Sequence, residues 1–426
     1  MDLFEDARSR LYEVLERLEV SDDVRERLSQ PVLSLQVSIP VRMDDGHLCV
    51  FKGWRVQYSN ILGPTKGGIR FHTNVNQTEV TTLSFWMAVK CAVVGLPYGG
   101  GKGGVEVDPK SLSLLELEQL ARGYIRAIAD VIGPDRDIPA PDVNTNATVM
   151  GWMADEYDHI VRRQTPAAIT GKPVELGGSI GRVAATGRGA LQVLDLWVER
   201  EGRSPEDLTV AIQGFGNAAY HFASLAHQKG YRIVALSDSQ GAIHSEKGLE
   251  PDPIWEEKTR NRDLTGMVYC DDSVRGQADR VQEIPQDALL TLDVDVLVLA
   301  ALEDQIHEGN VDDVQAGAIL EIANGPLTSA ADAALWKRGV PVLPDVLANT
   351  GGVIVSYLEW IQNRTGDYWD EATVNQRLAE RLGKETGRVL DRAEEEGVSY
   401  RTAAYLEGVE RIATAINRRG NRQDWD

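Results

Sequence analysis

The hydrophobic positions of the chain change their period after about residue 170, and this change predicts two regions of different architecture. Before it, some segments repeat apolar side chains every three or four positions, as amphipathic helices do, whereas others alternate them as strands do. The elements predicted there are helices at 3–18, 77–94, 112–132 and from about 147, and strands at 33–39 and 48–58. Residues 138–146 contain two prolines and are expected to form a rigid loop.

The glycine-rich passage 171–189 is predicted to link the two regions, because short apolar strands alternate with helices after it. The strands predicted there are 208–213, 231–236, 294–299, 318–322 and 340–343. This alternation is typical of a doubly wound parallel sheet. The last stretch, 352–419, is predicted to be helical and to pack back across both domains. A chain of 426 residues is also long enough for two cores.

The charge of the chain excludes several classes of partner. Its 65 acidic residues against 44 basic ones give a formal net charge of −21. Such a surface does not suit nucleic acid, whose phosphates require basic residues, or an anionic membrane. The longest apolar run, 296–302, is far shorter than the ~20 residues that span a bilayer. The acidic excess, with 33 arginines and only 11 lysines, suggests a protein adapted to strong salt.

The cysteines and histidines predict neither a disulfide framework nor a metal site. Cys49, Cys91 and Cys270 are odd in number and form no C-x-x-C pair, and the histidines lack the spacing of metal ligands. The acidic N-terminus has no basic region of the kind that begins a signal peptide. We therefore expect a protein of the reducing cytoplasm.

Three lysines, Lys66, Lys90 and Lys102, fall within 37 residues, and two of them lie among glycines. Glycine lets a ligand approach the main chain, and a lysine can bind a carboxylate or lose a proton. We interpret this segment as the floor of a polar pocket that holds three ammonium groups. Neighbouring positive charges and partial burial lower the pKa of an amine, which makes the glycine-enclosed Lys102 the candidate base. The alternative is three solvated surface lysines.

The sequence Gly214-x-Gly216-x-x-Ala219 lies between a predicted strand and a predicted helix, with Asp238 at the end of the next strand. In this context the motif predicts a dinucleotide site, where glycines and a helix N-terminus receive the pyrophosphate. The residues expected to contact the cofactor are Gly214, Phe215, Gly216, Asn217, Asp238 and Ser239. Asp238 favours NAD, but Ser239 could accept a phosphate, so NAD and NADP both stay open. An ordinary glycine turn is the other interpretation.

Five further polar residues have uses that spacing alone does not decide. Asp142 is either a carboxylate held for proton transfer or an N-cap of the following helix. Arg182 and Thr186 lie in the glycine linker, where closure of a cleft would bring them to a cofactor. Asn324 follows a core strand, where α/β sheets bind ligands, or else forms a turn before Gly-Pro. Ser356 by itself is only a helical serine.

From about residue 30 to the C-terminus, these motifs together resemble the glutamate dehydrogenases, which belong to the hexameric amino-acid dehydrogenase family. The resemblance is carried by Lys66-Gly-Gly-Ile-Arg70, Lys90-Cys-Ala-Val-Val-Gly95, Gly-Gly-Gly-Lys102-Gly-Gly, Pro139-Ala-Pro-Asp142, Ala185-Thr186-Gly187-Arg188-Gly189 and Asn349-Thr-Gly-Gly-Val353. It implies reversible, NAD- or NADP-dependent conversion of L-glutamate to 2-oxoglutarate and ammonium by a cytoplasmic homohexamer.

The resemblance also implies an α/β architecture of two domains and a role for each motif residue. Residues 1–180, with a C-terminal helix at about 396–426, would bind substrate and form the oligomer, and 181–395 would be a Rossmann-type dinucleotide domain. Lys102 would activate a water molecule, and Asp142 would transfer protons. The substrate would be bound by Lys66 and Ser356 at its γ-carboxylate, by Lys90 at its α-carboxylate, and by Met87, Arg182, Asn324 and Val353. Further cofactor contacts would be Thr186, Ala301, Asn324 and Asn349.

Leucine, valine and phenylalanine dehydrogenases share the Gly-Gly-Gly-Lys core, but the family pattern has apolar residues where Lys66 and Ser356 stand here. These two polar positions favour glutamate. A branched-chain or aromatic amino-acid dehydrogenase and a catalytically silent regulatory subunit remain alternatives. Ala219, Leu299 and Ile322 depart from the family pattern, and Ile322 could shift Asn324 from its cofactor contact.

Overall fold

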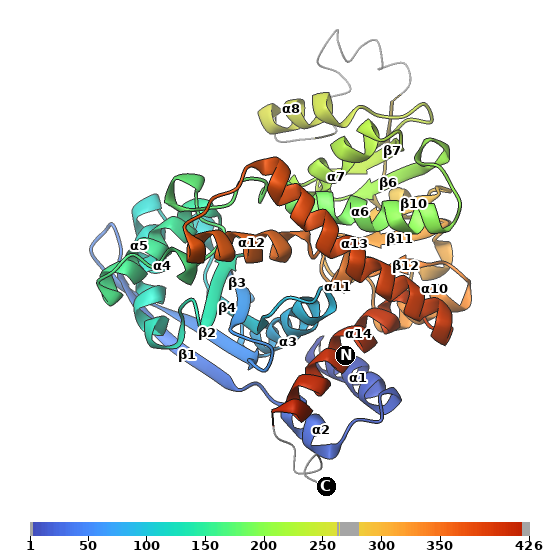
Figure 1. Cartoon of the computed structure of the whole chain (residues 1–426). Coiled ribbons are helices and arrows are strands. Elements are labelled where there is room, and N and C mark those ends of the chain that lie inside the picture. The colour runs from blue at the N-terminus through green and yellow to red at the C-terminus, as the bar shows by residue number, and fades with distance from the viewer. Residues whose placement is uncertain (1–2, 262–263, 265–280, 420–426) are drawn as a thin grey trace. The chain divides into compact units, whose positions relative to one another are not determined.

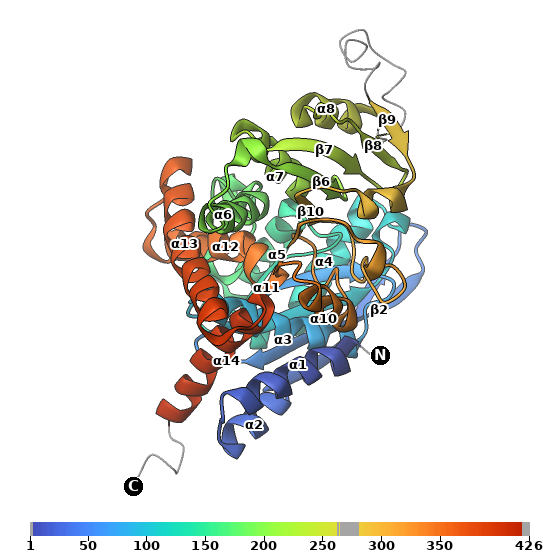
Figure 2. The ribbon, with the colours of Figure 1, turned by 90° about the vertical axis from the view of Figure 1, so that its right-hand side faces the viewer.

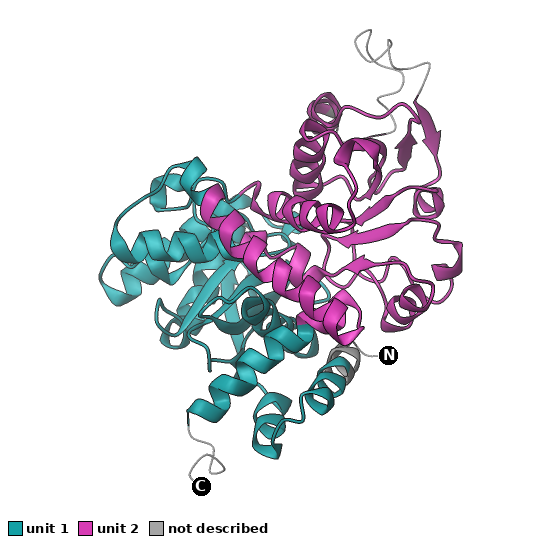
Figure 3. Ribbon diagram, turned by 45° about the vertical axis from the view of Figure 1, so that its right-hand side comes forward, with its two compact units in different colours: residues 1–182, 353–374, 405–426 teal, residues 183–352, 375–404 magenta. Residues whose placement is uncertain are grey.

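The structure is a computed structural model in which residues 3–261, 264 and 281–419 are described, so that Cys270 and the end of the predicted C-terminal helix lie outside the described residues. The chain divides into two compact units (Figure 3). Unit 1 comprises Met1–Arg182, Val353–Val374 and Tyr405–Asp426, and unit 2 comprises Val183–Gly352 and Asn375–Ala404. The segment 353–374, expected in the dinucleotide domain, belongs to unit 1 by its contacts.

Unit 1 is built on a five-stranded mixed sheet with the strand order β1-β2-β4-β3-β5, of which β1 to β4 are labelled in Figure 1. Its strands are β1 (Leu33–Arg42), β2 (Leu48–Ser59), β3 (Thr65–His72), β4 (Gly99–Glu106) and β5 (Asp137–Pro141). β3 is parallel to β4 and β5, and β2 is antiparallel to β1 and β4. The glycine- and proline-rich strands β3 to β5 were not predicted, because their residues have low strand propensity. Residues 138–141, expected as a loop, form an edge strand, where proline is tolerated.

Helices cover both faces of this sheet. The helices of unit 1 are α1 (Leu3–Arg17), α2 (Asp22–Ser29), α3 (Gln77–Val93), α4 (Leu114–Ile128), α5 (Ala147–Val161), most of α12 (Gly351–Thr365) and most of α14 (Tyr400–Arg418). α4 and α5 contribute Leu120, Tyr124 and Met150 to a buried core on one face. α3 packs on the other face. Side chains of Asn76 and Asn146 cap the starts of α3 and α5, which explains why these helices begin where they do.

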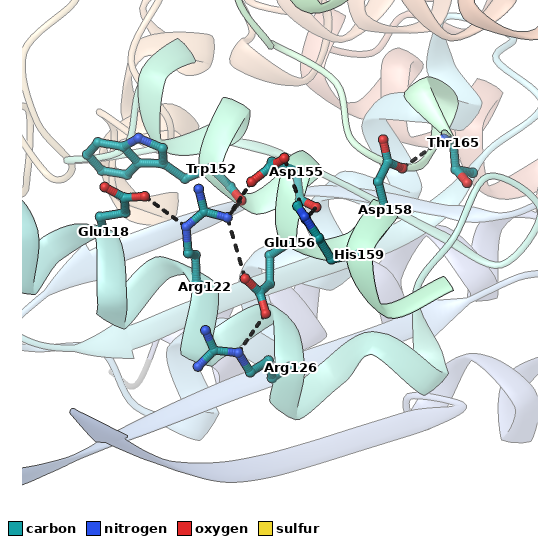
Figure 4. A network of polar contacts seen from close by, with 9 residues as sticks. All are labelled: Glu118, Arg122, Arg126, Trp152, Asp155, Glu156, Asp158, His159 and Thr165. Atoms are coloured by element: carbon teal, nitrogen blue, oxygen red, sulfur yellow. Dashed lines mark hydrogen bonds and ion pairs between the residues drawn. The ribbon is translucent and has the colours of Figure 1, made fainter. Parts of the chain in front are cut away.

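Arginines join α4 to α5 at the surface by binding several carboxylates at once (Figure 4). Arg122 contacts Glu118 at 2.8 Å and Asp155 at 2.7 Å, and Arg126 contacts Glu156 at 2.6 Å. A planar guanidinium can serve two acceptors, whereas an ammonium is a point charge, so arginine suits this surface better than lysine. Each such exposed pair contributes only about 0–1 kcal/mol.

Unit 2 contains a seven-stranded sheet with the strand order β12-β11-β10-β6-β7-β8-β9, part of which is seen in Figure 2. Its strands are β6 (Thr209–Gln213), β7 (Arg232–Ser237), β8 (Ala242–His244), β9 (Gln282–Ile284), β10 (Val296–Leu299), β11 (Ala318–Glu321) and β12 (Val342–Leu343). The strands from β12 to β7 are parallel, as a doubly wound sheet requires. β8 and β9 add an antiparallel edge, so the sheet is mixed and not wholly parallel as predicted.

The helices of unit 2 surround this sheet and are α6 (Ala185–Arg200), α7 (Asn217–Gln228), α8 (Pro251–Asn261), α10 (Ser329–Lys337), α11 (Asp345–Ala348) and most of α13 (Glu371–Glu396). α6 begins inside the predicted linker, and its glycines allow close packing against neighbouring segments. An added Cβ at Gly187 would be 2.4 Å from the carbonyl oxygen of Ala218 in α7. None of the helices in the described residues is long and apolar enough to cross a bilayer.

Candidate functional site

One face of the unit 1 sheet collects charged side chains, because successive residues of a strand point to opposite sides. In β3, Ile69 enters the core that α4 and α5 cover. Lys66 and Arg70, an odd number of positions away, therefore point to the face where α3 lies. Asp142, directly after β5, is on this face as well, since an added Cβ at Gly68 would be 2.6 Å from the Asp142 Cβ.

α3 lies directly on the glycines of β4, and this packing brings two more lysines to the same face. An added Cβ at Gly100 would be 2.4 Å from the backbone nitrogen of Ala88 in α3, so a larger residue would push the helix away. Lys102, two positions after Gly100, shares its face, and Lys90 belongs to α3. Met87, one turn before Lys90, is half-buried. The sequence suggested that these glycines let a ligand approach the main chain. The structure shows that they also let α3 pack closely on β4.

On the opposite face of β4, Gly101 and Gly103 leave room for a buried ion pair. Arg55 and Asp137 are fully buried and share two hydrogen bonds of 2.7 and 2.6 Å. An added Cβ would be 3.0 Å from Asp137 Oδ1 at Gly101, and 2.3 Å from the Tyr124 hydroxyl at Gly103. This bidentate pair fixes β2 to β5 behind the lysine-bearing face.

Lys102 and Asp142 are in direct contact, with Lys102 Nζ 2.8 Å from Asp142 Oδ2. Arg70 binds the same oxygen at 3.1 Å and Glu79 at 2.5 Å. Burial is the main cause that lowers the pKa of Lys102; Arg70 and Lys90 lower it further, and Asp142 opposes them. Burial favours a raised pKa for Asp142, but Lys102 and Arg70 outweigh it and the pKa is lowered. The two lowered pKa values therefore favour a neutral amine at Lys102 beside an ionised carboxylate at Asp142.

Lys66 is buried without an anionic partner. It is only 1% exposed, and its pKa is lowered to about 7, chiefly by burial and then by Arg182. Its acidic neighbour Glu359 is already engaged, because its two oxygens accept hydrogen bonds of 2.8 Å from Lys172 Nζ and from the Gly171 amide. Across the described residues, no carboxylate forms an ion pair with Lys66. A buried charge of this kind is costly unless an anion from outside joins it.

α12 carries the remaining candidates of unit 1. Ser356 is 1% exposed and lies one turn before Glu359, the acidic neighbour of Lys66, and Val353 lies one turn earlier on the same side. The hydroxyl of Thr170, in the segment that binds Glu359, is buried and has no hydrogen-bond partner among the described residues. No motif or spacing in the sequence pointed to Thr170 or Glu359. Their setting depends on contacts between segments 187 residues apart.

In unit 2 the glycine-rich turn lies between β6 and α7 and fits a pyrophosphate. Gly214 has a φ of +88°, which favours glycine, and an added Cβ there would be 2.6 Å from Ala301. An added Cβ at Gly216 would meet nothing within 4 Å, so space is open at the start of α7. The amides of this twelve-residue helix, which begins at Asn217, suit an anion in that space. The ring of Phe215 is fully buried, so only its main chain is available.

Asp238, the expected ribose ligand, is bound by a lysine that lies outside the predicted dinucleotide motif. Lys258 Nζ is 3.0 Å from Asp238 Oδ2 and donates a hydrogen bond of 2.8 Å to the Phe215 carbonyl. The other Asp238 oxygen accepts the Gln240 amide. Ser239 is exposed beside it. A cation therefore offsets the acid from which a preference for NAD was inferred.

The remaining cofactor candidates lie around α11 and the start of α6. Asn349 Nδ2 donates to Asn324 Oδ1 at 3.0 Å and to the Ile322 carbonyl at 3.1 Å. An added Cβ at Gly351 would be 2.0 Å from the carbonyl oxygen of Ala185, the residue directly before Thr186. This contact brings the start of α6 close to Asn349. Ile322, the departure from the family pattern, is accommodated, since its carbonyl takes part in holding the asparagine pair.

The two sites are typical of one class of protein: a dinucleotide-dependent oxidoreductase with a lysine–aspartate pair on a second sheet. Residues 31–159 match the family model described as the Glu/Leu/Phe/Val dehydrogenase dimerisation domain. Residues 177–420 match the model described as Glutamate/Leucine/Phenylalanine/Valine dehydrogenase. The chain therefore belongs to the glutamate, leucine, phenylalanine and valine dehydrogenase family.

Relatives of known name cover almost the whole chain. It is 51% identical to the NADP-specific glutamate dehydrogenase of Synechocystis, over 99% of this chain and 98% of that one. It is 42% identical to the NAD-specific glutamate dehydrogenase of Staphylococcus aureus, with 96% of each chain covered. Among solved structures, the hetero-hexameric glutamate dehydrogenase of Thermus thermophilus in its leucine-bound form has a TM-score of 0.92 at 35% identity, over 98% of this chain and 97% of that one.

We predict that Lys66→Met stabilises the protein in the absence of substrate. Because the pKa of the folded state, about 7, lies below the ordinary 10.5, burial of the ammonium costs most below pH 7, and this cost declines as pH rises toward 10.5. The melting temperature should rise by at least about 2 °C at pH 6 and by less at pH 9. Scanning calorimetry at both pH values measures this. Lys110→Met, at an exposed lysine, should show no such pH dependence, and a lower melting temperature for Lys66→Met at both pH values would contradict the prediction.

Proposed function

We propose that this protein is an NAD(P)-dependent glutamate dehydrogenase, which converts L-glutamate reversibly to 2-oxoglutarate and ammonium. The observation that carries the proposal is the buried ammonium of Lys66, whose acidic neighbour is already bound by Lys172. A γ-carboxylate supplies the missing anion, whereas the apolar end of leucine, valine or phenylalanine would leave the charge uncompensated. The relatives from Synechocystis and Staphylococcus aureus carry this activity in their names.

The substrate is held at both of its ends in this proposal. Lys66 and Ser356 bind the γ-carboxylate, and Lys90 binds the α-carboxylate as a point charge. The lysines at the two ends share Cys91 as an electrostatic neighbour, which supports a pocket bordered by both. The other residues assigned to the substrate are Met87, Arg182, Asn324 and Val353. Clamping both ends fixes the Cα of glutamate, and such orientation supplies much of the rate.

Lys102 and Asp142 carry the proton transfers. The bound cofactor supplies a hydride acceptor for the Cα hydrogen of glutamate. Lys102, in its neutral form, takes a proton from a water molecule that attacks the iminium carbon of the oxidised substrate. Asp142 exchanges protons with the substrate nitrogen as the carbinolamine forms and expels ammonia. The 2.8 Å contact between the two side chains supports their action as a pair.

The cofactor is NAD or NADP, and we propose that the protein accepts both. The main chain of Gly214, Phe215, Gly216 and Asn217, together with Ala301, Thr186, Asn324 and Asn349, would hold the pyrophosphate and nicotinamide ends. At the ribose, Asp238 suits the 2′-hydroxyl of NAD, and Lys258 and Ser239 suit the 2′-phosphate of NADP. The acid and the base side by side support use of either cofactor.

We also propose a cytoplasmic homohexamer adapted to salt. β1 is an edge strand of ten residues, and the family model that covers it describes a dimerisation domain, which supports self-association through unit 1. Cys49 and Cys91 are free thiols, as in a reducing compartment. The net charge of −21 supports solubility in strong salt.

Replacing Lys102 with alanine should abolish turnover and leave cofactor binding intact. Removal of a general base typically lowers kcat by about 10²- to 10⁴-fold. Stopped assays with glutamate measure turnover, and NADPH fluorescence titration measures binding. Lys110→Ala, an exposed lysine in the same unit, is the control and should behave as wild type. Unchanged turnover in Lys102→Ala would refute its role.

The double substitution Lys66→Leu with Ser356→Val should weaken glutamate far more than norvaline, whose side chain ends in a methyl group. Loss of a buried charge-assisted contact should lower kcat/KM for glutamate roughly 30-fold or more. Steady-state kinetics with both amino acids measure the ratio. Equal losses for both substrates would count against the γ-carboxylate assignment. A wild-type preference for leucine would favour the branched-chain alternative.

Lys258→Met should shift the cofactor preference toward NAD. Loss of one charge-assisted contact should weaken NADPH binding about tenfold, while NADH binding should change less than about threefold. Isothermal calorimetry with each reduced cofactor measures both affinities. Lys247→Met, an exposed lysine of the same unit, provides the control. Equal weakening of NADH and NADPH would show that Lys258 has no part in discrimination.

A further inference from the structure

Unit 2 contains a buried cluster of one guanidinium and three carboxylates that has no part in the proposed reaction. Arg401, in the first turn of α14, is 5% exposed, and each of its three nitrogens contacts a different acid. Nη2 is 2.6 Å from Glu321, Nε is 3.0 Å from Asp332, and Nη1 is 3.2 Å from Asp345. One arginine therefore joins the end of β11 to α10 and to the start of α11.

Two of these acids, Glu321 and Asp345, connect the cluster by hydrogen bonds to the loop 322–325, which carries Asn324. Glu321 Oε2 accepts the main-chain amide of Asp345 at 2.8 Å, and Asp345 Oδ2 accepts the amide of Gly325 at 3.1 Å. At the other end of α11, Asn349 Nδ2 donates to Asn324 Oδ1 at 3.0 Å. The short helix α11 thus holds the loop from both of its ends, and Arg401 holds α11.

Asp332 also contacts the guanidinium of Arg401, but it does not contact the loop 322–325. Within the described residues its carboxylate contacts Arg401, and no contact joins it to residues 322–325. Asp332 and Asp345 each contact the same arginine through a carboxylate. A change of either to asparagine removes the same charge from the cluster, but only the change at Asp345 alters a group that supports Asn324.

The cluster needs Arg401 to stay together, because three acids face one base. Burial raises the pKa of Glu321 to about 7, Arg401 opposes this effect, and Asp345 adds to it. Repulsion between Glu321 and Asp345 without the guanidinium would favour their separation. Movement of Asp345 would release the Gly325 amide, and the loop would lose one of the side-chain contacts that hold it. Its main-chain bonds to Leu299 and Asp304 would remain.

We propose that Arg401 and Asp345 are positioning residues, which hold the loop 322–325 so that Asn324 and Asn349 bind the nicotinamide end of the cofactor. The inference depends on the proposed function, because the two asparagines contact a cofactor only in that proposal. It assigns to the start of α14 a role in cofactor affinity, although Arg401 is not among the residues assigned to cofactor or substrate.

The test compares Asp345→Asn with Asp332→Asn in the full-length protein. Binding of NADPH and of NADH is measured by isothermal calorimetry without substrate, and stability is measured by the melting temperature. Asp345→Asn should weaken the tighter of the two cofactors about tenfold, whereas Asp332→Asn should weaken it less than about twofold. A purely structural role for the cluster would lower the melting temperature in both variants and would leave affinity equal.

A double-mutant cycle locates the effect at Asn324. Asn324→Ala alone should weaken the cofactor, and Asp345→Asn should add little to that loss if it acts through Asn324. Full additivity, or equal affinities in the two aspartate variants, would overturn the proposal.

Arg401→Lys keeps the charge but cannot bind three acids in a plane, and it serves as the second variant if Asp345→Asn does not fold. It should weaken the cofactor at least about threefold, and Arg200→Lys, in the exposed pair with Asp391 and Glu394, should not. Unchanged affinity in Arg401→Lys would overturn the proposal. A wild-type protein that bound neither NADH nor NADPH would instead refute the proposed function.

Discussion

The direct packing of α3 on the glycines of β4 is the constraint on which the unit 1 site depends. With an added Cβ at Gly100 only 2.4 Å from the Ala88 backbone nitrogen, no other residue permits this approach. Because the helix lies so close, Lys90 reaches the face of the sheet that carries Lys102. The same closeness leaves little room for water, and burial then becomes the main cause that lowers the pKa of Lys102.

The features of the fold that depend on a local pattern of apolar residues could be predicted from the sequence. The helix α3, the strands β1 and β2 and the parallel strands of unit 2 have clear apolar periods, and their bounds were predicted to within a few residues. For α5 the start was predicted correctly. β3, β4 and β5 were missed because their strand character comes from neighbours on both sides and not from the propensity of glycine and proline. The antiparallel strands β8 and β9, of three residues each, are too short to show a period.

The groups that control the chemistry were harder to predict, because each depends on a partner distant in the chain. The candidate lysines were found from glycine context and family resemblance, but the setting of Lys66 depends on Glu359, and that of Asp238 on Lys258. Repulsion between lysines and partial burial were both expected to lower the pKa of Lys102. Burial is the larger of the two causes, and its extent depends on tertiary packing, which spacing along a sequence does not contain.

Some buried charges of unit 1 form an ion pair with another residue of the chain, whereas Lys66 forms none among the described residues. Arg55 is bound by Asp137, and Lys172 by Glu359, with nearly all of each pair removed from water. Such pairs hold strands and helices in register, since removal of either partner would leave the other charge buried without a counter-ion. Lys66 stands beside them at equal depth, but both oxygens of its acidic neighbour are engaged. Burial of an uncompensated ammonium lowers the stability of the fold, and in the proposed function the γ-carboxylate of the substrate brings the missing negative charge.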